Sequence, residues 1–211
     1  MKEKKDIVEN WLPRYTGTLL AEFGEYVLLT NFDNYVEWFA TLHGGLVKGA
    51  DRPMPNVTAD EITLINFGMG SPNAATVMDL LSAIAPKAVL FLGKCGGLKR
   101  KNQIGDLILP IAAIRGEGTS NDYLPPEVPA LPAFQLQRAV STMIRDLGYD
   151  YWTGILCTRP IVVSGNTTIA SGISCVVREA WRSTWRLQQS LLRDLPTTFR
   201  LVRCFLCPIS Q

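Results

Sequence analysis

The sequence predicts an α/β domain in which helices cover a largely parallel sheet. Three observations support this fold class. Apolar runs of strand length alternate along the chain with segments whose apolar residues recur at helical spacing. The run at residues 88–92 is apolar throughout, which is typical of a parallel strand buried on both faces. Glycine-rich turns follow two of these runs, and ligands of such domains bind at the carboxyl ends of the strands.

The N-terminal part is expected to form a helix, a strand and a second helix. Apolar residues at helical spacing predict a short helix over residues 6–12, which Pro13 ends because proline cannot donate the next helical hydrogen bond. Residues 26–32 have the composition of a strand. Asp33 then serves as the N-cap of a helix, whose apolar face consists of Tyr35, Val36, Phe39 and Ala40.

The next segment contains a loop, a strand and a helix. Residues 43–60 are rich in glycine and proline and are expected to form a loop, whereas residues 61–67 form a strand. Ser71 as N-cap and Pro72 at the first helical position predict a helix over residues 74–84. The glycines before this helix and its N-terminus form a candidate anion site, although ordinary capping explains the same residues.

The turn after residues 88–92 is a second candidate site. It has glycine at positions 93, 96 and 97 with Lys94 between them, so its backbone N–H groups can approach an anionic or sugar ligand. A tight turn between core strands, with Lys94 solvated, explains the same residues. The turn is not a P-loop, because position 88 is alanine and position 95 is cysteine. Residues 68–73 likewise lack the third glycine of a dinucleotide fingerprint.

A further strand and helix are expected between residues 106 and 147. Residues 106–114 form a strand in which Pro110 marks an edge or a bulge. Residues 115–132 form a polar loop rich in proline. Residues 133–147 form an amphipathic helix that Gly148 stops, and its apolar face consists of Leu136, Ala139, Val140 and Met143.

Composition indicates a single domain in the cytoplasm. The 211 residues are 47% hydrophobic, which suits a full core, and no apolar run reaches the length of a membrane span. The N-terminus carries charge without the apolar region of a secretory signal. The cysteine count of 5 is odd, which argues against a disulfide scaffold and for a reducing compartment.

Three isolated features carry little functional weight. His43 is the only histidine and lies in a glycine-rich loop, so a structural or solvated role is expected. Cys204 and Cys207 form a C-x-x-C pair without a second pair, which makes a metal or redox role unexpected. Residues 176–195 hold two tryptophans one helical turn apart among arginines, the pattern of a basic amphipathic helix for a membrane or a partner.

Several motifs together resemble the purine nucleoside phosphorylase and nucleosidase superfamily. They are Gly68-Met-Gly-Ser-Pro-Asn73 before a helix, Gly-x-Cys-Gly-Gly after a buried strand, and Gly-Asp-Leu-Ile-Leu-Pro at residues 105–110. The loop at residues 115–132 resembles that of the bacterial AMP nucleosidases in particular. The resemblance covers residues 6–157.

This resemblance implies a three-layer α/β/α fold with a mixed central sheet. It also implies hydrolysis of AMP or a related purine nucleotide by a homo-oligomer, a hexamer in the family, without cofactor, metal, nucleic acid or membrane. Where phosphorylases bind phosphate through an arginine and a hydroxyl residue, this chain has Phe91 and Lys94, and Asn31-Phe-Asp and Tyr35 replace an early phosphate loop. These replacements favour hydrolysis over phosphorolysis.

Lys94 and Arg115 are candidates for the 5′-phosphate by their charge. The implied substrate-binding residues are Asn31, Gly68, Gly70, Ser71, Lys94, Cys95, Gly96, Gly97, Arg115, Glu117, Thr119, Ser120 and Tyr123.

Residues 158–211 differ in composition from residues 1–157. The first part has 14 Lys and Arg against 17 Asp and Glu, whereas the tail has 7 against 2, and each of those seven is arginine. The tail also holds three of the 5 cysteines. Such a change within one small protein suggests that the two parts have different origins.

A frameshift near residues 157–159 explains this change. The resemblance implies a Met-Glu-Thr segment whose glutamate holds the ribose hydroxyls, and a Ser-Asp-x-Pro segment whose aspartate protonates the leaving purine. Neither is present in the chain. Both are compatible with the tail in another frame, at residues 181–191 and 207–211, and residues 161–169 are compatible with a third family segment.

Under this hypothesis residues 1–157 are the N-terminal part of one phosphorylase-like domain, and residues 158–211 are an aberrant tail. The chain as written is then expected to be nearly inactive, to pack its tail poorly and to aggregate. Two alternatives stay open. One is a purine nucleoside phosphorylase or methylthioadenosine-type nucleosidase. The other is a non-catalytic nucleotide-binding module with a genuine basic tail.

Overall fold

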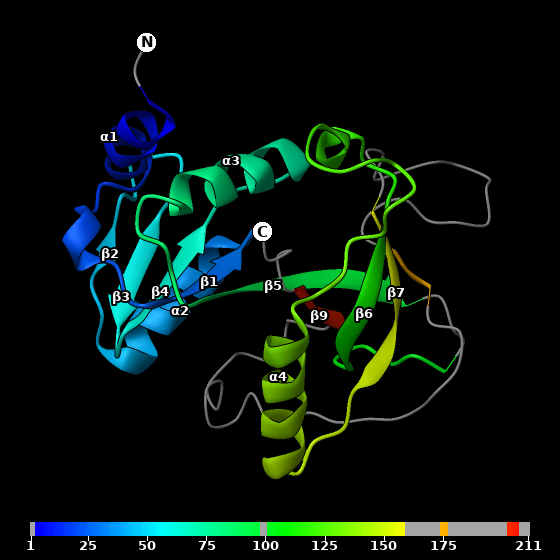
Figure 1. Cartoon of the computed structure of the whole chain (residues 1–211). Helices are drawn as coiled ribbons and strands as arrows, with labels where there is room; N and C mark the ends of the chain where they lie inside the picture. Colours follow the sequence, from blue (N-terminus) through cyan, green and yellow to red (C-terminus); the bar gives the residue numbers. More distant parts are fainter. Residues whose placement is uncertain (1–2, 98–100, 159–173, 177–201, 207–211) are drawn as a thin grey trace. The chain divides into compact units, whose positions relative to one another are not determined.

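The computed structural model describes residues 3–97, 101–158, 174–176 and 202–206 (Figure 1). The chain forms two compact units, Met1–Phe91 and Leu92–Gln211. Each unit contains strands of a mixed sheet, which confirms the predicted α/β class. The boundary falls within strand β5 (Ala88–Gly97), so this strand contributes residues to both units.

The first unit is built on four paired strands. In spatial order they are β2 (Val47–Lys48), β3 (Asn56–Ala59), β4 (Ile62–Asn66) and β1 (Tyr26–Thr30). β1 and β4 are parallel, and their register pairs Thr30 with Asn66, so both strands end at the same edge of the sheet. β3 is antiparallel to β2 and β4, which makes the sheet mixed.

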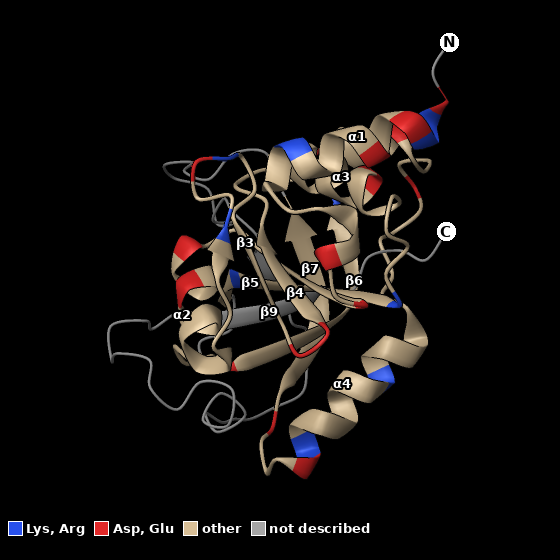
Figure 2. Ribbon diagram, turned by 90° about the vertical axis from the view of Figure 1, so that its left-hand side faces the viewer, with Lys and Arg blue, Asp and Glu red and all other residues tan. Residues whose placement is uncertain are grey.

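Helices cover both faces of this sheet and produce three layers (Figure 1). α1 (Lys4–Thr16) and α3 (Ser71–Leu81) pack on the face that carries Val27, Leu29 and Ile65. α2 (Asp33–His43) packs on the other face against Val57 and Leu64. Adjacent strand residues meet different helices because successive side chains of a strand point to opposite faces. Charged residues lie along α1 and α2, whereas β3 and β4 carry none (Figure 2).

The sequence-based prediction for α2 is largely confirmed. Tyr35, Val36 and Phe39 are buried, as the apolar spacing indicates. The predicted N-caps are wrong by one residue, because Phe32 and Gly70 occupy the N-cap positions of α2 and α3. Asp33 and Ser71 are therefore the first helical residues. α3 also ends at Leu81, three residues before the predicted end.

α1 extends through Pro13, contrary to the prediction that the helix ends there. It runs to Thr16 and stops at Gly17, which has φ +68°. Asn56 holds this end, because its Nδ2 donates to the Thr16 carbonyl at 2.7 Å. A helix leaves its last carbonyls without partners, and this buried bond satisfies one of them. The helix thus continues past the proline that local sequence rules treat as a stop, and a tertiary contact holds its end.

The predicted loop at residues 43–60 contains the strands β2 and β3. Within it, Gly49 approaches α1 closely, since a Cβ at position 49 would lie 2.1 Å from the Thr16 carbonyl oxygen. Gly49 also has φ +64°, a conformation that side chains of L-residues rarely adopt. The loop therefore packs on the end of α1 only because position 49 lacks a side chain.

Gly49→Ala is expected to destabilise the protein more than Gly44→Ala. Both glycines have a left-handed φ, +64° and +68°, so each alanine incurs a backbone cost of about 1–2 kcal/mol. Nothing lies within 4 Å of a Cβ at Gly44, whereas the carbonyl of Thr16 collides at Gly49 and adds about 1–3 kcal/mol. Urea denaturation followed by circular dichroism measures the difference, and equal losses in the two variants would contradict the close approach.

The second unit contains the remaining strands. Their spatial order is β5, β8 (Ser174–Val176), β7 (Trp152–Thr158), β6 (Leu107–Arg115) and β9 (Val202–Leu206). β6 is parallel to β7 with a register shift between Pro110 and Ala112, which agrees with the bulge that was one of the two expectations for Pro110. β8 is parallel to β5 and antiparallel to β7. Of the basic amphipathic helix predicted over residues 176–195, the structure describes only Val176. The segments at 161–169, 181–191 and 207–211, which are compatible with the other frame, also lie outside the described residues.

α4 (Phe134–Asp146) confirms the predicted helix but buries a different residue. Ile144 is buried with Leu107 and Tyr149, whereas Met143, which was predicted on the apolar face, is 59% exposed. The buried stripe is thus rotated by one position relative to the prediction. Gly148 has φ +77° after the helix, as expected for a glycine stop. Two short 3-10 helices complete the described elements, η1 (Leu20–Glu22) and η2 (Thr119–Asp122).

Candidate functional site

In the first unit, a polar network lies at the edge where β1 and β4 end. The Asn66 side chain is 5% exposed, and its Nδ2 donates to Oδ1 of Asp33 at the start of α2. Its Oδ1 accepts a hydrogen bond from the backbone N–H of Gly68 at 2.9 Å. Asn66 therefore connects the start of α2 to the glycine loop before α3.

Two unsatisfied oxygens lie at the same strand ends. Oγ1 of Thr30 and Oδ1 of Asn31 are buried without a hydrogen-bond partner in the part of the chain that the structure describes. Buried polar atoms are nearly always paired, so unpaired ones indicate a place where water or a ligand binds. Asn31 is one of the predicted binding residues, and its unpaired oxygen is consistent with that role.

The glycine loop before α3 is fixed at both of its ends. Gly68 and Gly70 have φ +77° and +97°, which explains why glycine is required at both positions. Gly68 donates to Asn66, and Nδ2 of Asn73 donates to the Met69 carbonyl at 3.0 Å. The loop thus presents a preformed backbone at the N-terminus of an 11-residue helix.

In the second unit, the predicted glycine turn at residues 93–97 is wrong, because these residues continue β5 as an extended strand. The pairing of Gly96 with Ser174 and Gly97 with Cys175 explains why the strand does not turn. Gly97 is required for packing, since a Cβ there would lie 2.6 Å from Cβ of Asn102. Lys94 is half-buried and Cys95 is buried, whereas Gly96 and Gly97 are exposed. The end of β5 therefore places the cation Lys94 near exposed glycine backbone.

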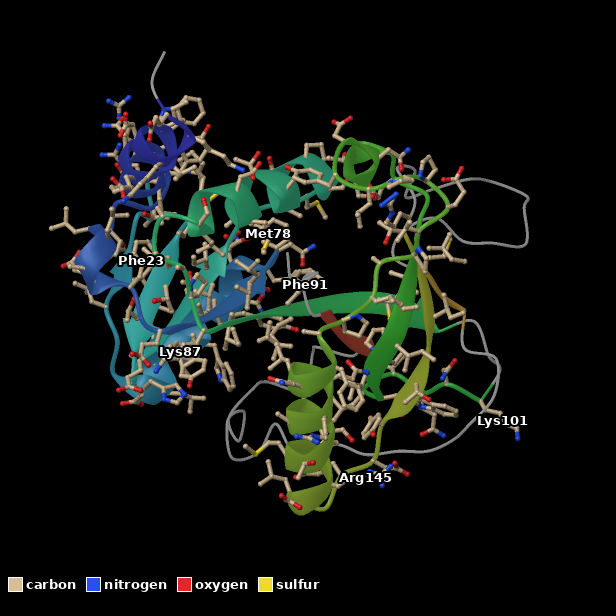
Figure 3. All side chains as sticks on the ribbon, viewed as in Figure 1. Phe23, Met78, Lys87, Phe91, Lys101 and Arg145 are labelled. Atoms are coloured by element: carbon tan, nitrogen blue, oxygen red, sulfur yellow. The ribbon has the colours of Figure 1, made fainter. Side chains whose placement is uncertain are left out.

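Phe91 lies where the family resemblance expects a phosphate-binding arginine. Its ring packs against Phe67 with the centroids 5.7 Å apart. It also joins the core of the first unit together with Met78 (Figure 3). Phe91 is therefore partly buried against the hydrophobic core.

The loop after β6 contains the remaining predicted residues, and Arg115 holds it together. The guanidinium of Arg115 donates to the carbonyls of Ser120, Leu124 and Pro125 and to Oδ1 of Asn121. Glu117 accepts hydrogen bonds from the backbone N–H and the hydroxyl of Ser120. Thr119 and Ser120 belong to η2, and Tyr123 directly follows it with 48% exposure.

The predicted residues thus fall into two groups, one in each unit. Asn31, Gly68, Gly70 and Ser71 surround the ends of β1 and β4, whereas the other nine lie on β5, at the last residue of β6 or in the loop after β6. The sequence patterns did not single out Asn66, and they assigned Asp33 only a capping role, although the two side chains are hydrogen-bonded at this edge. The available signal was that each is a polar residue at or just after the end of an apolar strand.

His43 has a structural environment, as expected. Its Nδ1 lies 3.1 Å from Oδ2 of Asp60, and its ring stacks on Phe39 with the centroids 4.4 Å apart. Among the described residues no three His, Cys, Asp or Glu side chains are arranged to hold a metal ion. Within the same residues, no helix is long and apolar enough to cross a membrane.

An α/β sheet with a polar site at its strand ends is the architecture of many nucleotide- and nucleoside-binding enzymes. The family model described as the phosphorylase superfamily matches residues 24–183, and the chain therefore belongs to this superfamily.

The most informative relatives are AMP nucleosidases. The crystal structure titled AMP nucleosidase from Bacteroides thetaiotaomicron is 61% identical, covers 76% of this chain and 67% of its own, and has a TM-score of 0.74. AMP nucleosidase of Escherichia coli K12 is 31% identical in an alignment of 166 residues that covers 61% of this chain but only 34% of that protein. The chain thus spans about a third of the length of this curated relative. Uridine phosphorylase of Vibrio fischeri, 17% identical with a TM-score of 0.66, shares the fold.

Proposed function

We propose that this chain carries the nucleotide-binding part of an AMP nucleosidase, which hydrolyses the N-glycosidic bond of AMP to adenine and ribose 5-phosphate. The observation that carries the proposal is the 61% identity to the Bacteroides protein over 76% of this chain. At this identity the residues that line a substrate site are commonly retained, whereas the phosphorylases that share the fold at 17% identity provide no such argument.

Hydrolysis rather than phosphorolysis agrees with the residues at the strand ends. Phe91 belongs to the core, and Tyr35, at the other position where the family resemblance expects an arginine, is buried. The carboxylate of Asp33 lies beside Asn66 at the ends of β1 and β4. Phe91 and Tyr35 offer inorganic phosphate no positive charge, which supports water as the second substrate.

We also propose that residues 158–211 are translated out of frame. Residues 1–157 make up about three quarters of the chain, which is close to the 76% that the Bacteroides protein covers. The family model extends 26 residues farther, to residue 183, so the boundary at 157 rests on composition and on the segments compatible with the other frame. In this proposal the ribose-binding glutamate and the purine-protonating aspartate belong to the other frame. A homo-oligomer in the cytoplasm remains our expectation for the intact enzyme.

The chain is expected to bind AMP more tightly than adenosine, with Lys94 as the cation for the 5′-phosphate. A charge-assisted hydrogen bond contributes about 1.5–3 kcal/mol, which corresponds to about tenfold or more in affinity. Isothermal titration calorimetry should show that Lys94→Met removes this preference. Lys101→Met, at an exposed lysine of the same unit, should leave it intact. Equal affinity for AMP and adenosine, or a preference for uridine, would favour a nucleoside phosphorylase instead.

A further inference from the structure

Arg115 is the last residue of β6, and its guanidinium is occupied by the loop that follows. Nη2 donates to the carbonyls of Pro125 at 2.8 Å and Leu124 at 2.9 Å and to Oδ1 of Asn121 at 3.1 Å. Nη1 approaches the carbonyls of Leu124 at 3.3 Å and Ser120 at 3.4 Å. One side chain thus fixes four residues of the loop.

The same loop is closed independently at its base and at its tip. Ala113 and Ala130 exchange backbone hydrogen bonds of 2.7 and 3.0 Å, which joins the two ends of the loop. Glu117 accepts from the backbone N–H of Ser120 at 3.1 Å and also from its hydroxyl. Arg115 lies between these two closures in the sequence and supplies the bonds to the middle of the loop.

This arrangement conflicts with a role for Arg115 as a phosphate ligand. Arginine binds phosphate through two parallel N–H donors, and both terminal nitrogens of Arg115 already serve protein acceptors. Its Nε is buried and has no partner in the described part of the chain, which leaves a single enclosed donor. Binding a phosphate would require breaking several of these bonds, and the half-buried carbonyls of Ser120 and Leu124 would then need new partners.

We propose that Arg115 is a positioning residue that holds the loop at residues 117–125 in its binding conformation, and that it does not contact the 5′-phosphate. The loop carries the predicted binding residues Glu117, Thr119, Ser120 and Tyr123. Because the loop is already ordered by Arg115, it binds a nucleotide without an additional ordering cost. The part of the inference that concerns the phosphate rests on the proposed function, whereas the part that concerns the loop does not.

Hydrogen exchange measured by mass spectrometry tests the loop directly. In Arg115→Met, exchange is expected to rise at least about tenfold at Asn121, Tyr123 and Leu124, whose N–H groups donate to the carbonyls of Gly118 and Ser120. Arg115→Lys keeps the charge but loses the planar fork, so it should loosen the loop nearly as much. Arg138→Met, at an exposed arginine on α4, is the control and should change nothing in the loop. Unchanged exchange in Arg115→Met would overturn the proposal.

The ratio of the affinities for AMP and adenosine tests the phosphate part. A positioning role predicts that Arg115→Met weakens both ligands by the same factor and leaves the ratio unchanged. Loss of the ratio with unchanged exchange in the loop would identify Arg115 as the phosphate ligand and overturn the proposal. If the unsubstituted chain binds neither ligand, the proposed function fails, while the exchange measurement still decides whether Arg115 holds the loop.

Discussion

A chain whose reading frame is restored after Cys157 is expected to release adenine from AMP at least about 10²-fold faster than the 211-residue chain. Proton transfer to the leaving base by a positioned acid contributes about 10²–10⁴-fold in such reactions. The described residues hold the binding groups that we propose, namely Lys94, the glycine loop at 68–70 and the loop that Arg115 holds. They include no segment of the Ser-Asp-x-Pro type that the family resemblance requires for the proton.

Three measurements make this prediction decisive. The coding DNA should show that one inserted or deleted base near codon 158 restores all three family segments in order. The rate of adenine release should then rise in the corrected chain. It should return to the rate of the 211-residue chain when the aspartate of the restored Ser-Asp-x-Pro segment is replaced by asparagine. A normal turnover rate by the uncorrected chain would refute the frameshift hypothesis and favour a genuine tail.

The elements of the fold that local patterns specify were predictable from sequence. The face of α2 follows from the spacing of Val36 and Phe39, and the bulge in β6 follows from Pro110, because both depend only on neighbouring residues. Pro13 was misinterpreted because Asn56, which holds the end of α1, is 40 residues away from Thr16 in the sequence. The glycines at 96 and 97 were misinterpreted because a strand from residues 174–176 pairs with them. Long-range partners overrode local propensity in both cases.

For the candidate site, the conformation of the glycine loop was predictable from sequence, but the contacts of the polar side chains were not. Glycine after an apolar strand marked the loop at 68–70, and the structure places positive φ angles there. Charge alone assigned Arg115 to a phosphate, because the sequence does not show that four later residues turn back to meet its guanidinium. Asn66 was overlooked since an asparagine at the end of a strand is an ordinary turn residue until its two partners are known.

Trp152→Ala is expected to give the largest loss of stability among single substitutions in the second unit, about 3–5 kcal/mol. Trp152 is 1% exposed, so truncation leaves a large cavity in the core. Its Nε1 donates to Oδ2 of Asp106 at 2.7 Å, and Asp106 is itself only 6% exposed. The same carboxylate accepts the backbone N–H of Gln103 at 2.9 Å, so the tryptophan holds the turn that leads into β6. The aspartate of the Gly-Asp-Leu-Ile-Leu-Pro motif is therefore structural.

A matched series separates the cavity from the hydrogen bond. Trp152→Phe keeps an aromatic ring but removes the donor to a buried carboxylate, and the expected loss is about 1–3 kcal/mol. Phe134→Ala, at a side chain that is 74% exposed on α4, is the control and should stay within about 0.5 kcal/mol. Urea denaturation followed by circular dichroism suits the series, because Trp152 itself contributes to the fluorescence. A loss below about 1 kcal/mol in Trp152→Ala would mean that the second unit does not depend on this core, since burial of a large aromatic residue cannot be removed at so small a cost from a packed interior.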